Sequence, residues 1–120
     1  MTTRPESSWL EVERVGDVAV ARFMRHRILE DDAVRAAGEE LLGLSDDDSC
    51  RKLLLNFGNV ESLTTAFFGK LLALHRRVEA AGGRLALCAV GPFLREIFGI
   101  LKLPAAVTVY DDEQQALQRI

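Results

Sequence analysis

Three hydroxyl side chains, Ser62, Thr64 and Thr65, stand directly before an apolar helical run, in a segment that we call the hydroxyl loop (residues 61–66). A hydroxyl at the start of a helix accepts a hydrogen bond from a backbone N–H that has no partner within the helix. Such a cap stabilises a helix by about 1 kcal/mol and requires no regulatory role. The residue types alone therefore predict turn and cap residues at this place.

The two histidines and two cysteines lack the spacing of a metal site or of an activated nucleophile. His26 lies between two arginines, His75 lies in a helical run beside two more, and no Cys-x-x-Cys pair is present. Free cysteine is among the most often buried residue types, so Cys50 and Cys88 are interpreted as packing residues. We expect no metal, no cofactor and no catalytic residues.

The charged clusters also have ordinary explanations. Asp46–Asp48 lacks the glutamate and spacing of a calcium loop, which favours a solvated loop. Gly82-Gly83 ends a helical run, whereas a phosphate-binding glycine loop opens one. One basic group is interpreted mainly as solvated surface, with contact to a phosphate or a partner as the lesser alternative: Arg25, Arg27, Lys70, Arg76 and Arg77.

Composition and charge restrict the class of protein. A net charge of −3 argues mildly against nucleic-acid binding. No apolar run approaches the ~20 residues of a membrane span, and the polar N-terminus lacks a signal-peptide core. We expect a cytoplasmic chain with a flexible tail at residues 1–7 and a single domain at residues 8–120.

The pattern of apolar residues predicts alternating strands and helices. Two extended runs separated by Gly16-Asp17 indicate a β-hairpin. The continuous apolar runs at 53–57 and 85–90 are typical of strands buried on both faces. Between and after them we expect helices beginning at Asp31-Asp32, Thr65, Pro92 and Asp111-Asp112, and a last strand at 107–110.

The predicted order is β-β-α-β-α-β-α-β-α. Alternation of this kind favours a mainly parallel five-stranded sheet in which only the first strand is antiparallel. The segment from Arg25 to Asp32 is predicted to be a polar bridge between the hairpin and the first helix.

Along nearly its whole length the chain resembles a STAS domain, the fold of bacterial anti-sigma factor antagonists. The similar stretches are Lys52 to Val60, Leu63 to Leu72, Leu74 to Leu85 and Val109 to Leu117, in the family's order and spacing. The resemblance implies an α/β fold with helices mainly on one face of the sheet. It also implies a regulatory role in binding partner proteins, often an anti-sigma factor with a kinase fold, and no enzymatic activity.

The resemblance also implies a phosphorylation switch in the hydroxyl loop. In phosphorylated members an aspartate precedes the acceptor hydroxyl, and here Thr64 replaces that aspartate while Thr65 occupies the acceptor position. Ala66 and Phe67 replace a serine and a glycine, and Asn56 replaces an aspartate that often ends the central strand. Thr65 is thus the first phosphoacceptor candidate and Thr64 the second.

The predicted partner surface surrounds this loop. Its candidate residues are Glu61, Ser62, Ala66, Phe67, Phe68, Lys70, Gly91 and Pro92. One of the two phenylalanines is expected in the core, and the other is either buried as well or exposed as an anchor for the partner. The function so predicted is an anti-sigma factor antagonist-like module in signal transduction and transcription regulation, as a monomer or weak homodimer. Two alternatives stay open: a constitutive scaffold without phosphorylation, and a module that binds a small molecule, nucleotide or lipid.

Overall fold

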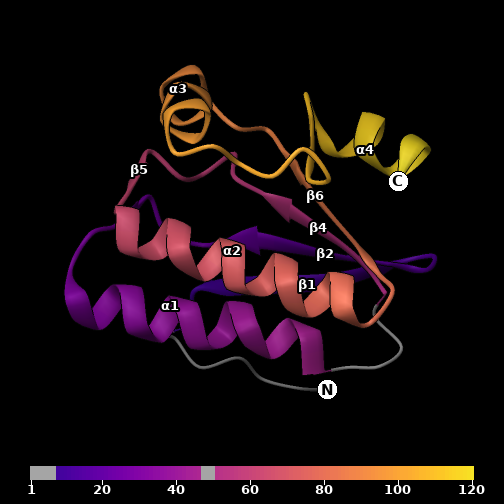
Figure 1. The fold of residues 1–120 in the computed structure, drawn as a ribbon, viewed down its shortest axis with the longest axis horizontal. Coiled ribbons are helices and arrows are strands. Elements are labelled where there is room, and N and C mark those ends of the chain that lie inside the picture. The colour runs from indigo at the N-terminus through magenta and orange to yellow at the C-terminus, as the bar shows by residue number, and fades with distance from the viewer. Residues whose placement is uncertain (1–7, 47–50) are drawn as a thin grey trace.

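The computed structural model describes residues 8–46 and 51–120. A five-stranded sheet in the order β1-β2-β4-β6-β7 runs through it (Figure 1). Strand β1 (Leu10–Val15) pairs antiparallel with β2 (Val18–Phe23), and β4 (Lys52–Asn56), β6 (Arg84–Cys88) and β7 (Thr108–Tyr110) continue the sheet in parallel. The predicted fold class and the single antiparallel strand are confirmed.

Helices cover the sheet unequally. Helices α1 (Asp31–Gly43) and α2 (Thr65–Ala80) lie side by side across one face (Figure 1). Helix α3 (Pro92–Ile100) lies near the first turn of α2. The short α4 (Glu113–Arg119) lies on the opposite face, and a 3-10 turn, η1 (Leu44–Asp46), follows α1. The expectation that helices lie mainly on one face is therefore confirmed.

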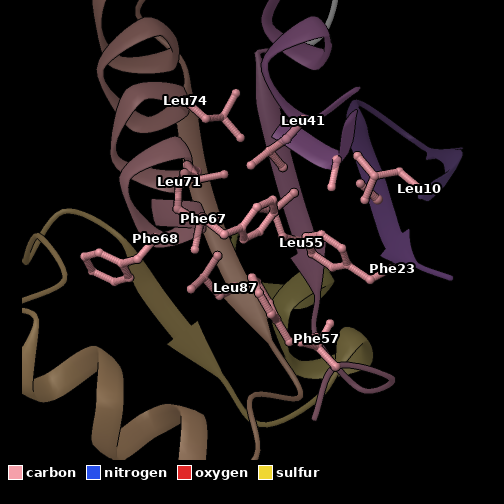
Figure 2. Close-up of a cluster of buried hydrophobic side chains, with 14 of the residues drawn as sticks. Leu10, Phe23, Leu41, Leu55, Phe57, Phe67, Phe68, Leu71, Leu74 and Leu87 are labelled. Atoms are coloured by element: carbon pink, nitrogen blue, oxygen red, sulfur yellow. The ribbon is translucent and has the colours of Figure 1, made fainter. Parts of the chain in front are cut away.

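The main core lies between the sheet and helices α1 and α2. Figure 2 shows Phe67, Leu71 and Leu74 of α2 directed toward Leu55 and Leu41. Aromatic rings join this core along its length. The ring centroids of Phe23 and Phe57 are 4.8 Å apart, and those of Phe23 and Phe67 are 5.9 Å apart. Burial of these large side chains is the principal stabilising term for this face.

The double glycine after α2 meets two separate requirements. Gly82 adopts φ +77°, a left-handed conformation that glycine tolerates best. A Cβ on Gly83 would lie only 2.2 Å from the carbonyl oxygen of Arg51, so a side chain at this position would displace the backbone. The Arg84 N–H then donates to that same carbonyl at 2.7 Å as β6 begins.

The predicted polar bridge between the hairpin and α1 is wrong in one respect. It contains a two-residue strand, β3 (Arg27–Ile28), which pairs in parallel with β5 (Ser62–Leu63) as a separate small sheet. Because α1 follows β3 and α2 follows β5, this pairing places the first turns of both helices next to each other (Figure 1). Two-residue strands carry too little hydrophobic pattern to be recognised in a sequence.

Three predictions fall partly or wholly outside the described residues. They are the flexible tail at residues 1–7, the packing role of Cys50, and Asp47 and Asp48 of the acidic loop. Among the described helices, none combines the length and apolar character needed to cross a bilayer.

Candidate functional site

The hydroxyl loop follows β4 after a turn at residues 57–60, and side-chain amides hold that turn. Asn56 Oδ1 accepts a hydrogen bond from the Gly58 N–H at 2.7 Å, and Asn59 Nδ2 donates to the Phe23 carbonyl at 3.1 Å. The Phe57 N–H donates to the Cys88 carbonyl at 3.0 Å, so the chain leaving β4 stays against the end of β6. The loop is therefore anchored to the strands on both sides of β4.

The segment around His26 forms the other support of the loop. Its backbone carbonyl accepts from the N–H groups of Glu61 and Ser62 at 2.8 and 3.3 Å. Its ring Nδ1 lies 2.8 Å from the Asn59 carbonyl oxygen, and the Thr64 N–H donates to the Ile28 carbonyl at 3.2 Å. No role for His26 could be predicted from the sequence, because its contacts are with backbone atoms remote in the chain.

The two threonines at the start of α2 have different environments. Thr64 is the N-cap residue, and its Oγ1 accepts a hydrogen bond from the Phe67 N–H at 3.2 Å. Thr65 is the first residue of the helix and is exposed, as is Ala66 beside it. The predicted capping function is thus confirmed for Thr64, while the exposed side chain of Thr65 is displayed to solvent.

Phe67 and Phe68 are both buried, with 0% and 3% of their surface exposed. The alternative in which one ring projects as an anchor is wrong, and both residues are removed from the partner surface. The cause is the position of α3, since Phe98 of that helix lies 5.4 Å from Phe68 between ring centroids. Phe68, in the first turn of α2, therefore packs against α3 instead of facing solvent.

The other predicted surface residues differ in their exposure and contacts. Glu61 is exposed and forms a long ion pair with Arg27 at 3.9 Å, and Ser62 is half-buried. The alkyl chain of Lys70 packs across α1, where its carbons lie 3.0 Å from the place of a Cβ on Gly38. This contact explains why α1 carries a buried glycine facing α2.

The turn into α3 lies at the same end of the sheet as the hydroxyl loop. Gly91 is the N-cap residue and the exposed Pro92 is the first residue of the helix, a favourable position for proline. Phe93, which follows, is 61% exposed. The register of β4 with β6 pairs Asn56 with Cys88, which brings the two following loops alongside each other.

A polar network on the α4 face was not predicted. Glu113 Oε1 and Oε2 accept from Arg22 Nε and Nη2 at 2.5 and 2.9 Å, and Glu113 Oε1 also accepts from Asn56 Nδ2 at 2.8 Å. Hydrogen bonding by Arg22 is the main cause that lowers the pKa of Glu113, and hydrogen bonding by Glu113 in turn raises the pKa of Arg22. Asn56 thus binds Glu113 through its amide nitrogen and the Gly58 N–H through its amide oxygen.

This network explains the amide at the end of the central strand. An aspartate at position 56 would lack the N–H group that Asn56 donates to Glu113. Its carboxylate would face the Glu113 carboxylate, and like charges at this distance repel. The sequence contained the signal in Asn56 itself, but its partner Glu113 lies fifty-seven positions away, on helix α4. Only the fold brings the two together.

The remaining candidates for chemistry are structural. Cys88 is wholly buried, and burial is the main cause that raises the pKa of its thiol to about 12. His75 Nε2 lies 3.5 Å from Glu79 one helical turn away. Within residues 8–46 and 51–120, no group of histidine, cysteine and acidic side chains is arranged to hold a metal ion.

Comparison with known proteins agrees with this architecture. The anti-sigma F factor antagonist of Paenibacillus polymyxa is 24% identical over 71 residues, which span 59% of this chain and 61% of that relative. A STAS-domain anti-sigma-factor antagonist from Planctomyces limnophilus has a TM-score of 0.79 at 22% identity, over 91% of this chain and 95% of its own. The Bacillus cell fate determinant SpoIIAA in its phosphorylated form has a TM-score of 0.69 at 21% identity, over 92% and 97%.

At such identities the solved structures establish a common fold. The family assignment rests on a family model, that of the STAS domain, which matches residues 16–116. That match includes every strand of the main sheet except β1, as well as the hydroxyl loop and all of α1, α2 and α3. This chain belongs to the STAS domain family.

Proposed function

We propose that this chain is a regulator of the anti-sigma factor antagonist type, which binds a partner protein through the hydroxyl loop and the adjoining turn at Gly91-Pro92. The observation that carries the proposal is the division of work between the two threonines. Thr64 caps α2, so the exposed Thr65 is available for recognition and modification without loss of the cap. The partner so proposed is a kinase-fold anti-sigma factor or a related serine/threonine kinase.

The electrostatics of α2 suit a phosphate on Thr65. The first turn of this helix carries no acidic residue, whereas that of α1 carries Asp31 and Asp32. A phosphate at the helix start interacts favourably with the exposed N–H groups and the positive end of the dipole. It also adds about −1.5 to −2 charges to an outward surface. Modification would thus alter docking while leaving the fold intact.

Two relatives support this reading. The Paenibacillus polymyxa relative is an anti-sigma F factor antagonist, and the Bacillus relative SpoIIAA has been solved in a phosphorylated form. The replacements Thr64, Ala66 and Phe67 are accommodated in this chain, since Thr64 supplies the cap and Phe67 fills the core. The binding role is proposed as regulatory and not catalytic.

The test uses the purified chain and the kinase-fold anti-sigma factor encoded nearest to its gene. After incubation with ATP, mass spectrometry of intact protein and peptides is expected to find one phosphate on Thr65 in the wild type and none in Thr65→Val. Thr64→Val is the matched control, which should still accept phosphate. Phosphate found only on Thr64, or none on the loop with an active kinase, would overturn the switch.

Binding is measured separately by calorimetry with the same partner. Thr65→Asp is expected to weaken affinity at least tenfold, about 1.4 kcal/mol, through charge and bulk at the docking surface. Equal affinity of the wild type and Thr65→Asp would favour the constitutive scaffold. Absence of binding by the unphosphorylated wild type would contradict the partner-binding role itself.

A further inference from the structure

A cavity of about 280 Å³ lies between α3 and the ends of β6 and β7, and no residue of the hydroxyl loop lines it. Its floor is apolar, and two cationic side chains, Arg95 and Lys102, border it. The other lining residues are Val90, Phe98, Gly99, Leu103 and Val109. We call it the α3–β7 pocket.

One of the residues that border the pocket is a glycine of α3. A Cβ built on Gly99 meets no atom within 4 Å, although Gly99 borders the cavity. Glycine in a helix disfavours the folded state relative to alanine, so this position is not optimised for helix stability. An apolar space bordered by a few polar groups is the usual form of a small-molecule site, and this one is near the lower size limit of ~300 Å³.

Lys102 occupies an unfavourable backbone conformation at the mouth of the pocket. Its φ is +62°, in the left-handed region, at the position after α3 where glycine is the common residue. The Leu103 N–H donates to the Phe98 carbonyl at 3.1 Å, the reverse-turn bond that ends such helices. From this position Lys102 borders the apolar cavity.

The two cations of the rim differ in their partners. Arg95 is held by the Val90 carbonyl at 3.1 Å and by Asp111 at 3.2 Å. Lys102 forms no ion pair with any residue in 8–46 or 51–120. The rim therefore offers one neutralised cation and one available cation, in a chain whose net charge is −3.

We propose that the α3–β7 pocket binds a small amphiphilic carboxylate, with its chain or ring on the floor formed by Phe98, Leu103 and Val109 and its carboxylate on Lys102. A carboxylate matches the single available cation, and the apolar part removes the exposed floor from water. The pocket shares no lining residue with the proposed partner surface, although Val90 directly precedes the Gly91-Pro92 turn, and the proposal does not depend on phosphorylation.

The test is a titration of the ¹⁵N-labelled chain with sodium octanoate below its micelle-forming concentration, followed by amide chemical shifts. Saturable shifts are expected for Gly99, Leu103 and Val109, with little change in the hydroxyl loop. Octan-1-ol, which has the same chain without the charge, is expected to bind about tenfold more weakly, since a charge-assisted hydrogen bond is lost.

Three variants separate specific binding from general apolar association. Lys102→Gln should weaken octanoate binding about tenfold, and Gly99→Leu should abolish it by filling the cavity. Phe93→Ser removes an exposed apolar side chain of α3 that does not line the pocket, and it should leave the affinity unchanged. Unperturbed spectra elsewhere and an unchanged thermal midpoint establish that each variant is folded.

Equal affinity of Lys102→Gln and the wild type would overturn the proposal, as would shifts that do not saturate. Binding that survives Gly99→Leu would place the ligand elsewhere and have the same consequence. These outcomes leave the proposed phosphorylation untouched, because Thr65 is assayed with a different reagent.

Discussion

The two faces of the central sheet are stabilised by different interactions. On the face covered by α1 and α2, the side chains of β4 and β6 are wholly apolar, and Phe23, Phe57 and Phe67 pack ring against ring. On the opposite face the apolar cluster is small, and α4 contributes only Ala116 as a fully buried residue. There the bidentate pair of Arg22 and Glu113 connects the helix to the sheet.

The difference shows how a short helix is fixed where little apolar surface can be buried. A seven-residue helix is marginal by itself and must obtain its stability from tertiary contacts. The Arg22–Glu113 pair is about one-quarter exposed and is tied to Asn56, so it is better ordered than an isolated surface pair. Asn56 is also the residue at which β4 ends before the turn into the hydroxyl loop.

The largest effect is expected on the apolar face. Phe67→Ala should lower the free energy of unfolding by about 3–5 kcal/mol, because it removes a fully buried ring that the surrounding core cannot replace. Phe93→Ala, at a position 61% exposed, should change it by less than about 0.5 kcal/mol. Urea unfolding followed by circular dichroism gives both values, and similar losses in the two variants would contradict the proposed location of the core.

A smaller effect is expected on the α4 face. Glu113→Ala should cost about 1.5–3 kcal/mol, because Arg22 Nε and Nη2 and Asn56 Nδ2 lose their charged acceptor. Among the described residues, Arg22 then keeps only its ion pairs with Glu13 at 2.8 Å and Glu11 at 3.8 Å. Gln114→Ala is the matched control on the same helix, where the side chain is exposed and little change is expected. If Glu113→Ala were as mild as its control, α4 would be held by its apolar contacts alone.

A still smaller effect is expected from acidification, which should weaken the ion pair on the α4 face and leave the apolar contacts of the other face unchanged. The pKa of Glu113 is lowered in the folded chain, chiefly by its hydrogen bond from Arg22, from an ordinary value of 4.5. Its contribution is therefore fully present above pH 4.5 and is lost as the pH falls through the lower folded value. Between pH 6 and pH 3 the wild type should lose more stability than Glu113→Gln in the same urea titration. Parallel losses would show that the Arg22–Glu113 pair contributes nothing in this range.

The apolar face was the part that sequence could predict. Runs such as Leu53 to Phe57 and the stripe Phe67, Leu71, Leu74 and Val78 express a local period, and a local period needs no knowledge of distant residues. The Gly82-Gly83 stop was predicted for the same reason. The two-residue strands β3 and β5 were missed because pairing at that length is decided by tertiary contact.

The candidate site was predicted in position but not in detail. The start of α2 and its hydroxyl residues could be located, since cap residues have a strong local preference. Which threonine forms the cap depends on the residue at which the helix begins. Sequence patterns do not predict the ends of helices to within one residue. The exclusion of Phe68 from the surface required Phe98, and the role of Asn56 required Glu113.

The smallest effect on the free energy of unfolding is expected in the hydroxyl loop. Thr64→Ala should destabilise the chain by about 1 kcal/mol, because the Phe67 N–H loses its acceptor. Thr65→Ala should be close to neutral, since the exposed first residue of α2 provides no cap and alanine is a good helix former. Unfolding in urea resolves a difference of this size when the two variants are measured side by side. A larger loss in Thr65→Ala would mean that Thr65 supports the fold, and the separation of structural and regulatory roles between adjacent threonines would then fail.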